Sequence, residues 1–270
     1  MRLKRLLGWL LAALVSALML APFLVMLSTS LMEEFAVFRE PVPLWPAHPQ
    51  WQNYREALTA LPFGRFFLNA LVFSGLVVVG QVVTAATAGY AFARLRFPGR
   101  RPLFAVTLGL LMVPAVVLLI PRFLLIHALG WVDSVPGLVS TELVSVWGIF
   151  LVRQACQAVP RELEDAARLD GAGEWAVFAE VALPALRPAL ATLALFGFID
   201  SWKNYLWPLI ATPSLDHRTV EVGVGTLHGL YGSSWPHQMA AAVTALVPLL
   251  LVFLVLQRYF IRGIQWTGYR

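Results

Sequence analysis

Long apolar stretches without charge constrain this chain more than any other feature of its sequence. Residues 7–29 and 66–93 contain no Asp, Glu, Lys or Arg, and about 20 mostly apolar residues suffice for a helix to cross a bilayer. Only 13% of the 270 residues are charged, against about 25% in an ordinary soluble domain. The sequence therefore predicts an integral membrane protein and excludes the soluble, disordered and coiled-coil classes.

Six segments are long and apolar enough to span a membrane. None of them alternates apolar and polar residues like a strand of a transmembrane barrel, so each is predicted to be a helix. The expected fold class is an all-α polytopic membrane protein, with residues 1–270 forming a single domain. The predicted spans are residues 7–29, 66–93, 102–126, 134–152, 188–212 and 238–257.

The first predicted span follows a basic segment, Met1–Arg5, as the core of a signal peptide would. Its apolar run is longer than the roughly 7–15 residues of a signal-peptide core. No convincing small-residue cleavage pattern follows it. We expect this span to be retained as a membrane anchor.

Basic residues gather on one side of the predicted spans. Of the 20 Lys and Arg residues, 14 lie at the two termini, near residue 97 and within residues 153–187, and six lie on the other side. Because Lys and Arg are enriched in cytoplasmic loops, both termini and loop 155–187 are predicted to be cytoplasmic. Orientation then accounts for the formal net charge of +5, and no nucleic acid partner is predicted.

Signatures of catalysis and of metal binding are missing from the sequence. Lys4 and Lys203 are the only lysines and neither follows a glycine, which excludes a P-loop. The single cysteine, Cys156, can form neither an intrachain disulfide nor a cysteine cluster. The three histidines of residues 213–237 are too dispersed to favour a metal site. No enzymatic activity, no metal and no cofactor are predicted for this chain.

Loop 155–187 contains the most informative local pattern. Pro160 suits the first turn of a helix, acidic residues follow it where the positive helix end favours them, and Gly171 suits the end of that helix. A second short helix is predicted from Ala172 to Pro184, with aromatic residues on one face. Periodicity leaves two interpretations open: a surface whose aromatic side chains fill a pocket on a partner, or an amphipathic helix resting on the lipid interface.

The same loop resembles the EAA loop of binding-protein-dependent ABC importer permeases. The residues Asp165-Ala166-Ala167 are followed after three residues by Gly171, and after nine more by Val181-Ala182-Leu183-Pro184. This spacing matches the motif over 20 residues, with Asp in place of the usual Glu and Val in place of the usual Ile. The resemblance implies that the segment couples the chain to a separate ATP-binding subunit. The implied coupling residues are Asp165, Ala166, Ala167, Gly171, Trp175 and Phe178.

Other stretches are similar to the carbohydrate-uptake branch of that family, which includes the maltose and glycerol-3-phosphate importer permeases. Within that branch, the chain resembles the second of the two permease subunits. They are residues 88–100, 120–130, 198–208 and 257–263. The resemblance implies the type I importer transmembrane fold, the bacterial inner membrane as location and a carbohydrate as the transported molecule. The implied partners are a second permease subunit, two subunits that bind the ATP, and an extracytoplasmic solute-binding protein.

Two charges, Asp200 and Lys203, lie near the middle of the fifth predicted span. Charged side chains are costly inside a membrane unless they are paired or hydrated, so they form a functional hypothesis. The interpretation we favour is a structural ion pair on one helix face. The other is a substrate path formed together with Trp202, Asn204 and Tyr205, because aromatic rings and polar groups suit sugars.

The function favoured by the sequence is that of a membrane subunit in an ATP-driven carbohydrate importer, with ATP hydrolysis supplied by other subunits. An ion-coupled secondary transporter that uses Asp200 is the alternative. A membrane enzyme or an assembly scaffold is a third hypothesis. Glu142 in the fourth predicted span is a further, weaker candidate for a functional charge.

Overall fold

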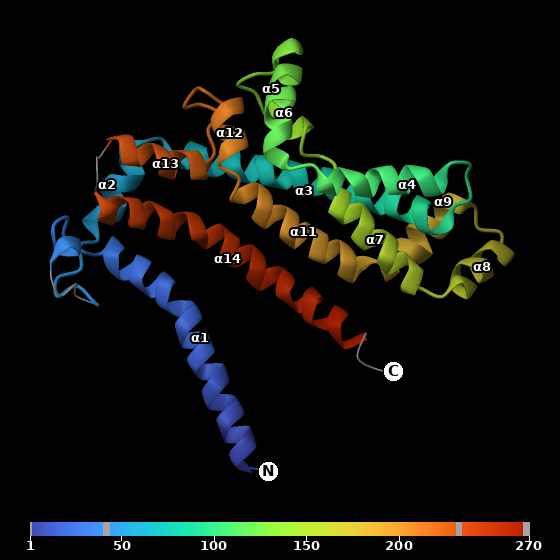
Figure 1. The fold of residues 1–270 in the computed structure, drawn as a ribbon, viewed down its shortest axis with the longest axis horizontal. Helices are drawn as coiled ribbons and strands as arrows, with labels where there is room; N and C mark the ends of the chain where they lie inside the picture. Colours follow the sequence, from blue (N-terminus) through green and yellow to red (C-terminus); the bar gives the residue numbers. More distant parts are fainter. Residues whose placement is uncertain (1, 40–43, 231–233, 267–270) are drawn as a thin grey trace. The chain divides into compact units, whose positions relative to one another are not determined.

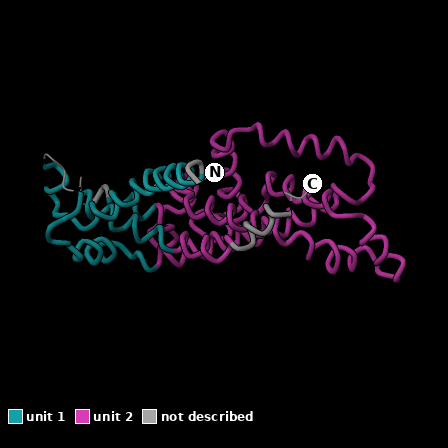
Figure 2. The backbone as a smooth tube through the Cα atoms, turned by 90° about the horizontal axis from the view of Figure 1, so that it is seen from below, with its two compact units in different colours: residues 1–64, 222–247 teal, residues 65–221, 248–270 magenta. Residues whose placement is uncertain are grey.

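The computed structural model describes residues 2–39, 44–230 and 234–266, and the regular elements in these ranges are all helical. Side-chain environments are described for residues 5–39, 44–227 and 234–257. The chain divides into two compact units (Figure 2). The first consists of residues 1–64 and 222–247, and the second of residues 65–221 and 248–270.

The helices succeed one another with short connections (Figure 1). In chain order they are α1 (Arg2–Ser30), α2 (Gln52–Ala60), α3 (Phe63–Arg94), α4 (Arg100–Gly109), α5 (Leu119–Ala128), α6 (Val135–Ser140), α7 (Val146–Ala158), α8 (Arg161–Leu169), α9 (Glu174–Ala176), α10 (Leu183–Ala185), α11 (Arg187–Trp202), α12 (Leu206–Ala211), α13 (Val220–Leu230) and α14 (Trp235–Trp266). Tighter 3₁₀ turns cover Ala36–Phe38, Leu110–Met112 and Ala115–Leu118, and a wider π turn covers Val177–Ala182.

Three of the predicted spans are single long helices. Spans 7–29, 66–93 and 238–257 fall within α1, α3 and α14. Each of these helices is apolar and long enough to cross a membrane. The uncharged runs that defined these spans therefore fold as the sequence predicts.

The other predicted spans are interrupted. Span 102–126 is divided into Arg100–Met112 and Ala115–Ala128, which are bent by 97°. Pro114 lies at this break and forces an extended backbone on the preceding residue. Span 134–152 is divided into α6 and α7 by residues 141–145. A second bent pair consists of Glu174–Ala185 and Arg187–Trp202, with an angle of 72°. By length and composition the described helices provide three spans, or up to five if each of the two bent pairs counts as one. The count of six therefore stays a prediction.

In the first unit, hydrogen bonds join the end of α1 to α2. The Asn53 side-chain amide donates to the backbone carbonyls of Ser30 and Met32 at 2.9 Å, and the Ser30 and Tyr54 hydroxyls lie 2.7 Å apart. These bonds use carbonyls that the end of a helix leaves without an intrahelical partner. The preceding part of α1, residues 5–25, is exposed along its whole length, as expected for a helix that faces lipid or another transmembrane helix.

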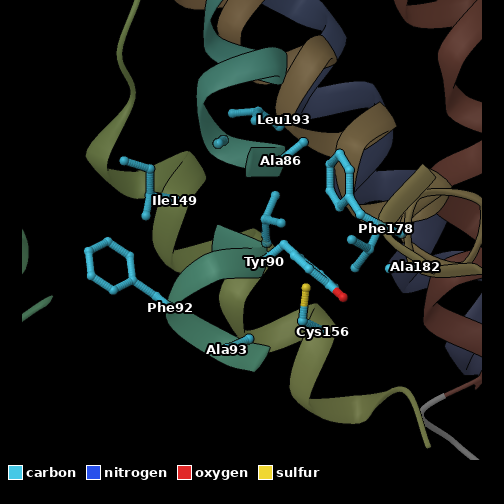
Figure 3. Close-up of a cluster of buried hydrophobic side chains, with 12 residues drawn as sticks. Ala86, Tyr90, Phe92, Ala93, Ile149, Cys156, Phe178, Ala182 and Leu193 are labelled. Atoms are coloured by element: carbon cyan, nitrogen blue, oxygen red, sulfur yellow. The ribbon is translucent and has the colours of Figure 1, made fainter. Parts of the chain in front are cut away.

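In the second unit, an apolar core joins α3 and α7 to the segment that precedes α11. Figure 3 shows Tyr90 of α3, Cys156 of α7 and Phe178 pointing toward one another. Gly89 permits a close approach, because a side chain there would begin 2.8 Å from Val152 of α7. Burial raises the pKa of the Cys156 thiol to about 11, which fits a packing role for this cysteine.

Candidate functional site

The EAA-like segment begins with a short helix whose ends match the sequence prediction. Helix α8 starts directly after Pro160, carries two acidic residues in its first turn and has Arg168 in its last turn. Its end is closed by two hydrogen bonds of 3.0 Å, from the Gly171 N–H to the Arg168 carbonyl and from the Ala172 N–H to the Ala167 carbonyl. A helix end closed by these two hydrogen bonds requires a residue in the left-handed backbone conformation, and Gly171 has φ +88°.

A buried ion pair ties α8 to α3. The Arg94 Nε and Glu164 Oε1 atoms lie 2.7 Å apart, and the two side chains are only 5% and 3% exposed. Arg94 also donates through Nη2 to the Val159 carbonyl at 2.6 Å. The sequence assigned Glu164 only a role at the helix N-terminus. Its partnership with Arg94 has no local signal, because the two residues lie far apart in the sequence.

Arg168 organises the exposed side of the same segment. Its guanidinium lies 2.9 Å from an Asp165 oxygen and 2.8 Å from a Glu174 oxygen. Hydrogen bonding to Arg168 holds the pKa of Glu174 below its usual value. Asp165, the acidic residue of the EAA-like motif, is thus held by a residue one turn further along α8.

The two predicted coupling aromatics have different environments. Phe178 is 7% exposed and packs on Tyr90 with ring centroids 5.0 Å apart, whereas Trp175 is 74% exposed. The expectation that both fill a pocket on a partner is therefore wrong for Phe178, which belongs to the core. Pro184 does not end the second helical stretch as predicted, because α10 continues through it and the bend falls at Leu186.

Apolar side chains are concentrated on the outer surface of the segment. Leu163, Leu169 and Trp175 are large and exposed, and Ala166 adds a small exposed residue beside them. A charged helix that exposes this much apolar surface is typical of an interaction site.

A second candidate site is a cavity of about 870 Å³ in the second unit. It is lined by parts of α3, α5, the α6–α7 connection and α11, and by residues that follow α11. Asp200, Lys203, Asn204 and Tyr205 all line it. The structure thus brings four of the five predicted path residues to one cavity.

Trp202, the fifth predicted path residue, does not line the cavity. Its side chain is 1% exposed and stacks on Phe198 with ring centroids 5.4 Å apart. A different tryptophan, Trp207, is among the lining residues. Its indole nitrogen donates to the Leu138 carbonyl at 2.9 Å, which fixes the ring in place.

The ion pair predicted between Asp200 and Lys203 is not formed, although Lys203, the C-cap residue of α11, keeps helical backbone angles and donates its N–H to the Ile199 carbonyl. Helix α11 ends at Trp202, and residues 203–205 separate it from α12. The described ion pairs with distances up to 4.0 Å do not include Asp200 with Lys203. Asn204 uses its side-chain oxygen to accept from the Trp207 N–H at 3.3 Å, which supports the first turn of α12.

The ion pair of the cavity joins Arg122 to Glu142 instead. Arg122 also donates to the Thr141 hydroxyl at 2.8 Å, and its guanidinium carbon lies 4.1 Å from the centre of the Trp207 ring. Such a stacked guanidinium gains from cation–π attraction. The sequence marks Glu142 only as a weak candidate and does not predict its partnership with Arg122, because the two residues lie in separate predicted spans.

Two of the histidines of residues 213–237 have separate partners. His217 lies 3.5 Å from an Asp133 oxygen. His237 lies 2.9 Å from a Glu56 oxygen and 2.6 Å from the Ser234 hydroxyl. The side chain of His228 is outside the described residues, and no group of three metal-ligating side chains occurs among those that are described.

Comparison with known sequences gives one consistent family. The profile of the binding-protein-dependent transport system inner membrane component matches residues 81–266. The arabinooligosaccharides transport system permease protein AraQ of Halalkalibacterium halodurans is 35% identical over 203 residues, covering 75% of this chain and 73% of the relative. The sn-glycerol-3-phosphate transport system permease protein UgpE of Yersinia pestis is 33% identical over 255 residues, covering 92% and 91%.

Solved structures share the fold at lower identity. A bacterial ABC transporter involved in the import of the acidic polysaccharide alginate contains a chain that matches with a TM-score of 0.80 at 24% identity, covering 96% of this chain and 97% of that one. The bacterial alginate ABC transporter in complex with an alginate pentasaccharide-bound periplasmic protein matches with a TM-score of 0.69 at 16% identity, covering 94% and 93%.

Proposed function

The chain belongs to the family of inner membrane components of binding-protein-dependent transport systems, and from this premise we propose that it forms part of the translocation path of an ATP-driven carbohydrate importer. A second permease subunit, two ATP-binding subunits and an extracytoplasmic solute-binding protein complete the transporter. The ATP is bound and hydrolysed by the partner subunits, and this chain supplies the path and the mechanical connection. Family membership disfavours the ion-coupled secondary transporter.

The geometry of the EAA-like segment is the observation that supports this function best. Its exposed residues Leu163, Leu169 and Trp175 offer an apolar surface, while the buried Arg94–Glu164 pair fixes α8 to α3. A partner that binds this surface and moves would therefore move α3 with it. Among the predicted coupling residues we assign Asp165, Ala166, Ala167, Gly171 and Trp175 to docking or to its immediate support, and Phe178 to the core beneath.

The lining of the cavity supports a hydroxylated substrate. Exposed aromatic rings of Trp147 and Tyr205 line the cavity together with the polar side chains of Asp200, Lys203 and Asn204. Such a combination provides flat apolar surfaces for sugar rings and hydrogen-bonding groups for hydroxyls. Relatives named for arabinooligosaccharides and glycerol-3-phosphate support a carbohydrate or a sugar or glycerol phosphate as the substrate class.

The membrane topology that fits this function has six spans with both termini in the cytoplasm. The bent pair Arg100–Met112 and Ala115–Ala128, the interrupted α6–α7 region and the interrupted α11–α12 region then count as spans broken within the membrane. Non-helical backbone at membrane depth is tolerated where it lines a cavity, and both residues 142–145 and residues 203–205 contribute to the cavity lining. The distribution of Lys and Arg supports the orientation.

Co-purification with an ATP-binding subunit tests the proposal. We expect the wild-type chain, expressed with its partners, to retain that subunit, and Gly171→Pro to lose it, because proline cannot adopt φ +88°. Gly173→Pro is the matched control, since Gly173 has φ −69°, which proline accepts. Absence of any ATP-binding partner from the wild type, or equal retention by both variants, would contradict the proposal. Ion-driven transport by the chain alone in vesicles would favour the secondary transporter.

A further inference from the structure

Five arginines surround a hollow at the turn between α3 and α4. The hollow has a volume of about 770 Å³ and is lined by Arg94, Arg96, Arg100, Arg101 and Arg161, together with the Phe97–Gly99 turn and Pro102. Arg161 is the first residue of α8, so α8 approaches the turn from another part of the second unit (Figure 1). Apart from Arg94, which pairs with Glu164, the function proposed above does not use these arginines.

Most of the positive charge in the hollow has no carboxylate partner within the chain. Arg94 is paired with Glu164, and Arg100 donates to the Leu95 carbonyl at 2.9 Å. Among the described side chains, no carboxylate oxygen lies within 4.0 Å of Arg96, Arg101 or Arg161. Guanidinium groups held together without a counter-charge repel one another and favour an external anion.

The start of α4 adds to this positive potential. Gly99, with φ +77°, is the N-cap residue and makes no side-chain capping bond, and the first turn contains no acidic residue. Arg100 and Arg101 occupy that turn instead. The helix dipole makes such an end favourable for an anion, whereas basic residues there are unfavourable unless an anion compensates for them.

An exposed apolar strip leads away from the hollow along α4. Leu103, Val106 and Leu110 are all exposed, and their spacing places them on one side of the helix and its 3₁₀ extension. The strip begins two residues after Arg101. A cationic hollow at one end of an apolar strip is complementary to a molecule with an anionic head and hydrocarbon chains.

We propose that this hollow binds the phosphate headgroup of an anionic phospholipid, with the acyl chains lying along the apolar strip of α4. Arginine binds phosphate oxygens through two parallel N–H groups, and the positive-inside rule places this turn at the cytoplasmic leaflet, where anionic lipids attract basic residues. The apolar strip favours a lipid over free phosphate. The site depends on the membrane location of the chain and not on its transported substrate.

Lipid retention by the assembled transporter tests the site. The complex is transferred into nanodiscs of phosphatidylcholine containing phosphatidylglycerol, and bound phosphatidylglycerol is quantified by native mass spectrometry. We expect the double variant R96Q/R101Q to bind phosphatidylglycerol roughly thirtyfold more weakly, which corresponds to about 1 kcal/mol for each arginine. The control R5Q/R187Q removes two other exposed arginines that are predicted to lie on the same side, and should retain the lipid.

Charge-retaining variants and a free anion complete the test. R96K/R101K should keep most of the phosphatidylglycerol, and the single variant R101Q, expected to bind it about fivefold more weakly, replaces the double glutamine variant if that does not assemble. Equal retention by R96Q/R101Q and the control would overturn the proposal. So would displacement of phosphatidylglycerol by millimolar inorganic phosphate, which would indicate a free-anion site. Loss of an ATP-binding subunit from R96Q/R101Q with unchanged lipid would assign the arginines to a protein interface instead.

Discussion

The EAA-like segment and the cavity differ in how their charges are satisfied. In the segment, Glu164 is buried against Arg94, and Arg168 holds both Asp165 and Glu174. In the cavity, Arg122 is paired with Glu142, but Asp200 and Lys203 line the open space and form no ion pair with each other. Paired charges maintain a shape, whereas charges left open to a cavity can be offered to a passing molecule. The first region is therefore built for rigidity and the second for recognition.

The two regions also differ in how locally they are encoded. The segment is formed by consecutive residues 161–185 and its turn is closed by neighbours in sequence. The cavity is lined by residues from Gln81 to Trp207. Substitutions in the segment should therefore change stability and coupling, and substitutions in the cavity should change transport alone.

The largest expected effect is the loss of the buried pair in the segment. Glu164→Gln leaves the Arg94 guanidinium buried without its counter-charge, which should destabilise the protein by about 3–5 kcal/mol. Thermal or denaturant unfolding of the purified protein measures this. The control Asp165→Asn removes an exposed partner of Arg168 and should cost less than about 1 kcal/mol. Similar stabilities for the two variants would show that the pair does not fix α8 to α3.

The next effect concerns recognition in the cavity. Lys203→Met removes the ammonium group but keeps an unbranched side chain, so assembly and stability should stay near those of the wild type. Transport should fall roughly tenfold to a hundredfold if the ammonium binds substrate, the range expected for a hydrogen bond to a charged group of about 1.5–3 kcal/mol. Uptake assays in reconstituted vesicles measure it. Unchanged transport with normal assembly would remove Lys203 from the path.

A smaller effect tests the turn that ends α8. Gly171→Ala places a side chain at φ +88°, where an L-residue costs about 1–2 kcal/mol. No atom lies within 4 Å of the added carbon, so the cost comes from the backbone alone. Gly173→Ala is the control, because Gly173 has an ordinary φ of −69° and equal space around it. Equal unfolding curves for the two variants would rule out the left-handed turn.

The smallest effect is a pH dependence in the exposed side of the segment. Because Arg168 lowers the pKa of Glu174 in the folded protein, the pair stabilises the fold above the usual carboxyl pKa of about 4.3. That contribution is lost as the pH falls through the lowered pKa of the folded state. Glu174→Gln should thus be less stable than the wild type at neutral pH, by at most about 0.5 kcal/mol, and equally stable in acid. A difference that persists in acid would assign the effect to packing.

Local chemistry explains which parts of these regions could be predicted. The bounds of α8 follow from Pro160, the acidic first turn and Gly171, all of which act within a few residues. The long helices α1, α3 and α14 follow from uncharged apolar runs. The family motif groups the predicted coupling residues, but its spacing does not show that Phe178 is buried while Trp175, whose ring centroid lies 5.4 Å from that of Phe178, is exposed.

The other parts of these two regions depend on contacts between segments that are distant in the sequence. The pairs Arg94–Glu164 and Arg122–Glu142 join residues that no local pattern relates. The end of α11 does have a local cause in the sequence. Pro208 has no N–H for a continuous helix, and its ring would clash with the Asn204 carbonyl. That proline predicts the break at residues 203–205, between α11 and α12.

The Arg94–Glu164 pair has a consequence that follows from length. Helix α3 has 32 residues, so at 1.5 Å per residue it is a rod of about 48 Å, longer than the roughly 30 Å hydrocarbon core. The pair clamps α8 to the last residue of this rod. A tilt of about 5° imposed at that end would displace the opposite end by about 4 Å. A small swing of α8 would thereby reach the far face of the membrane as a displacement wider than a water molecule.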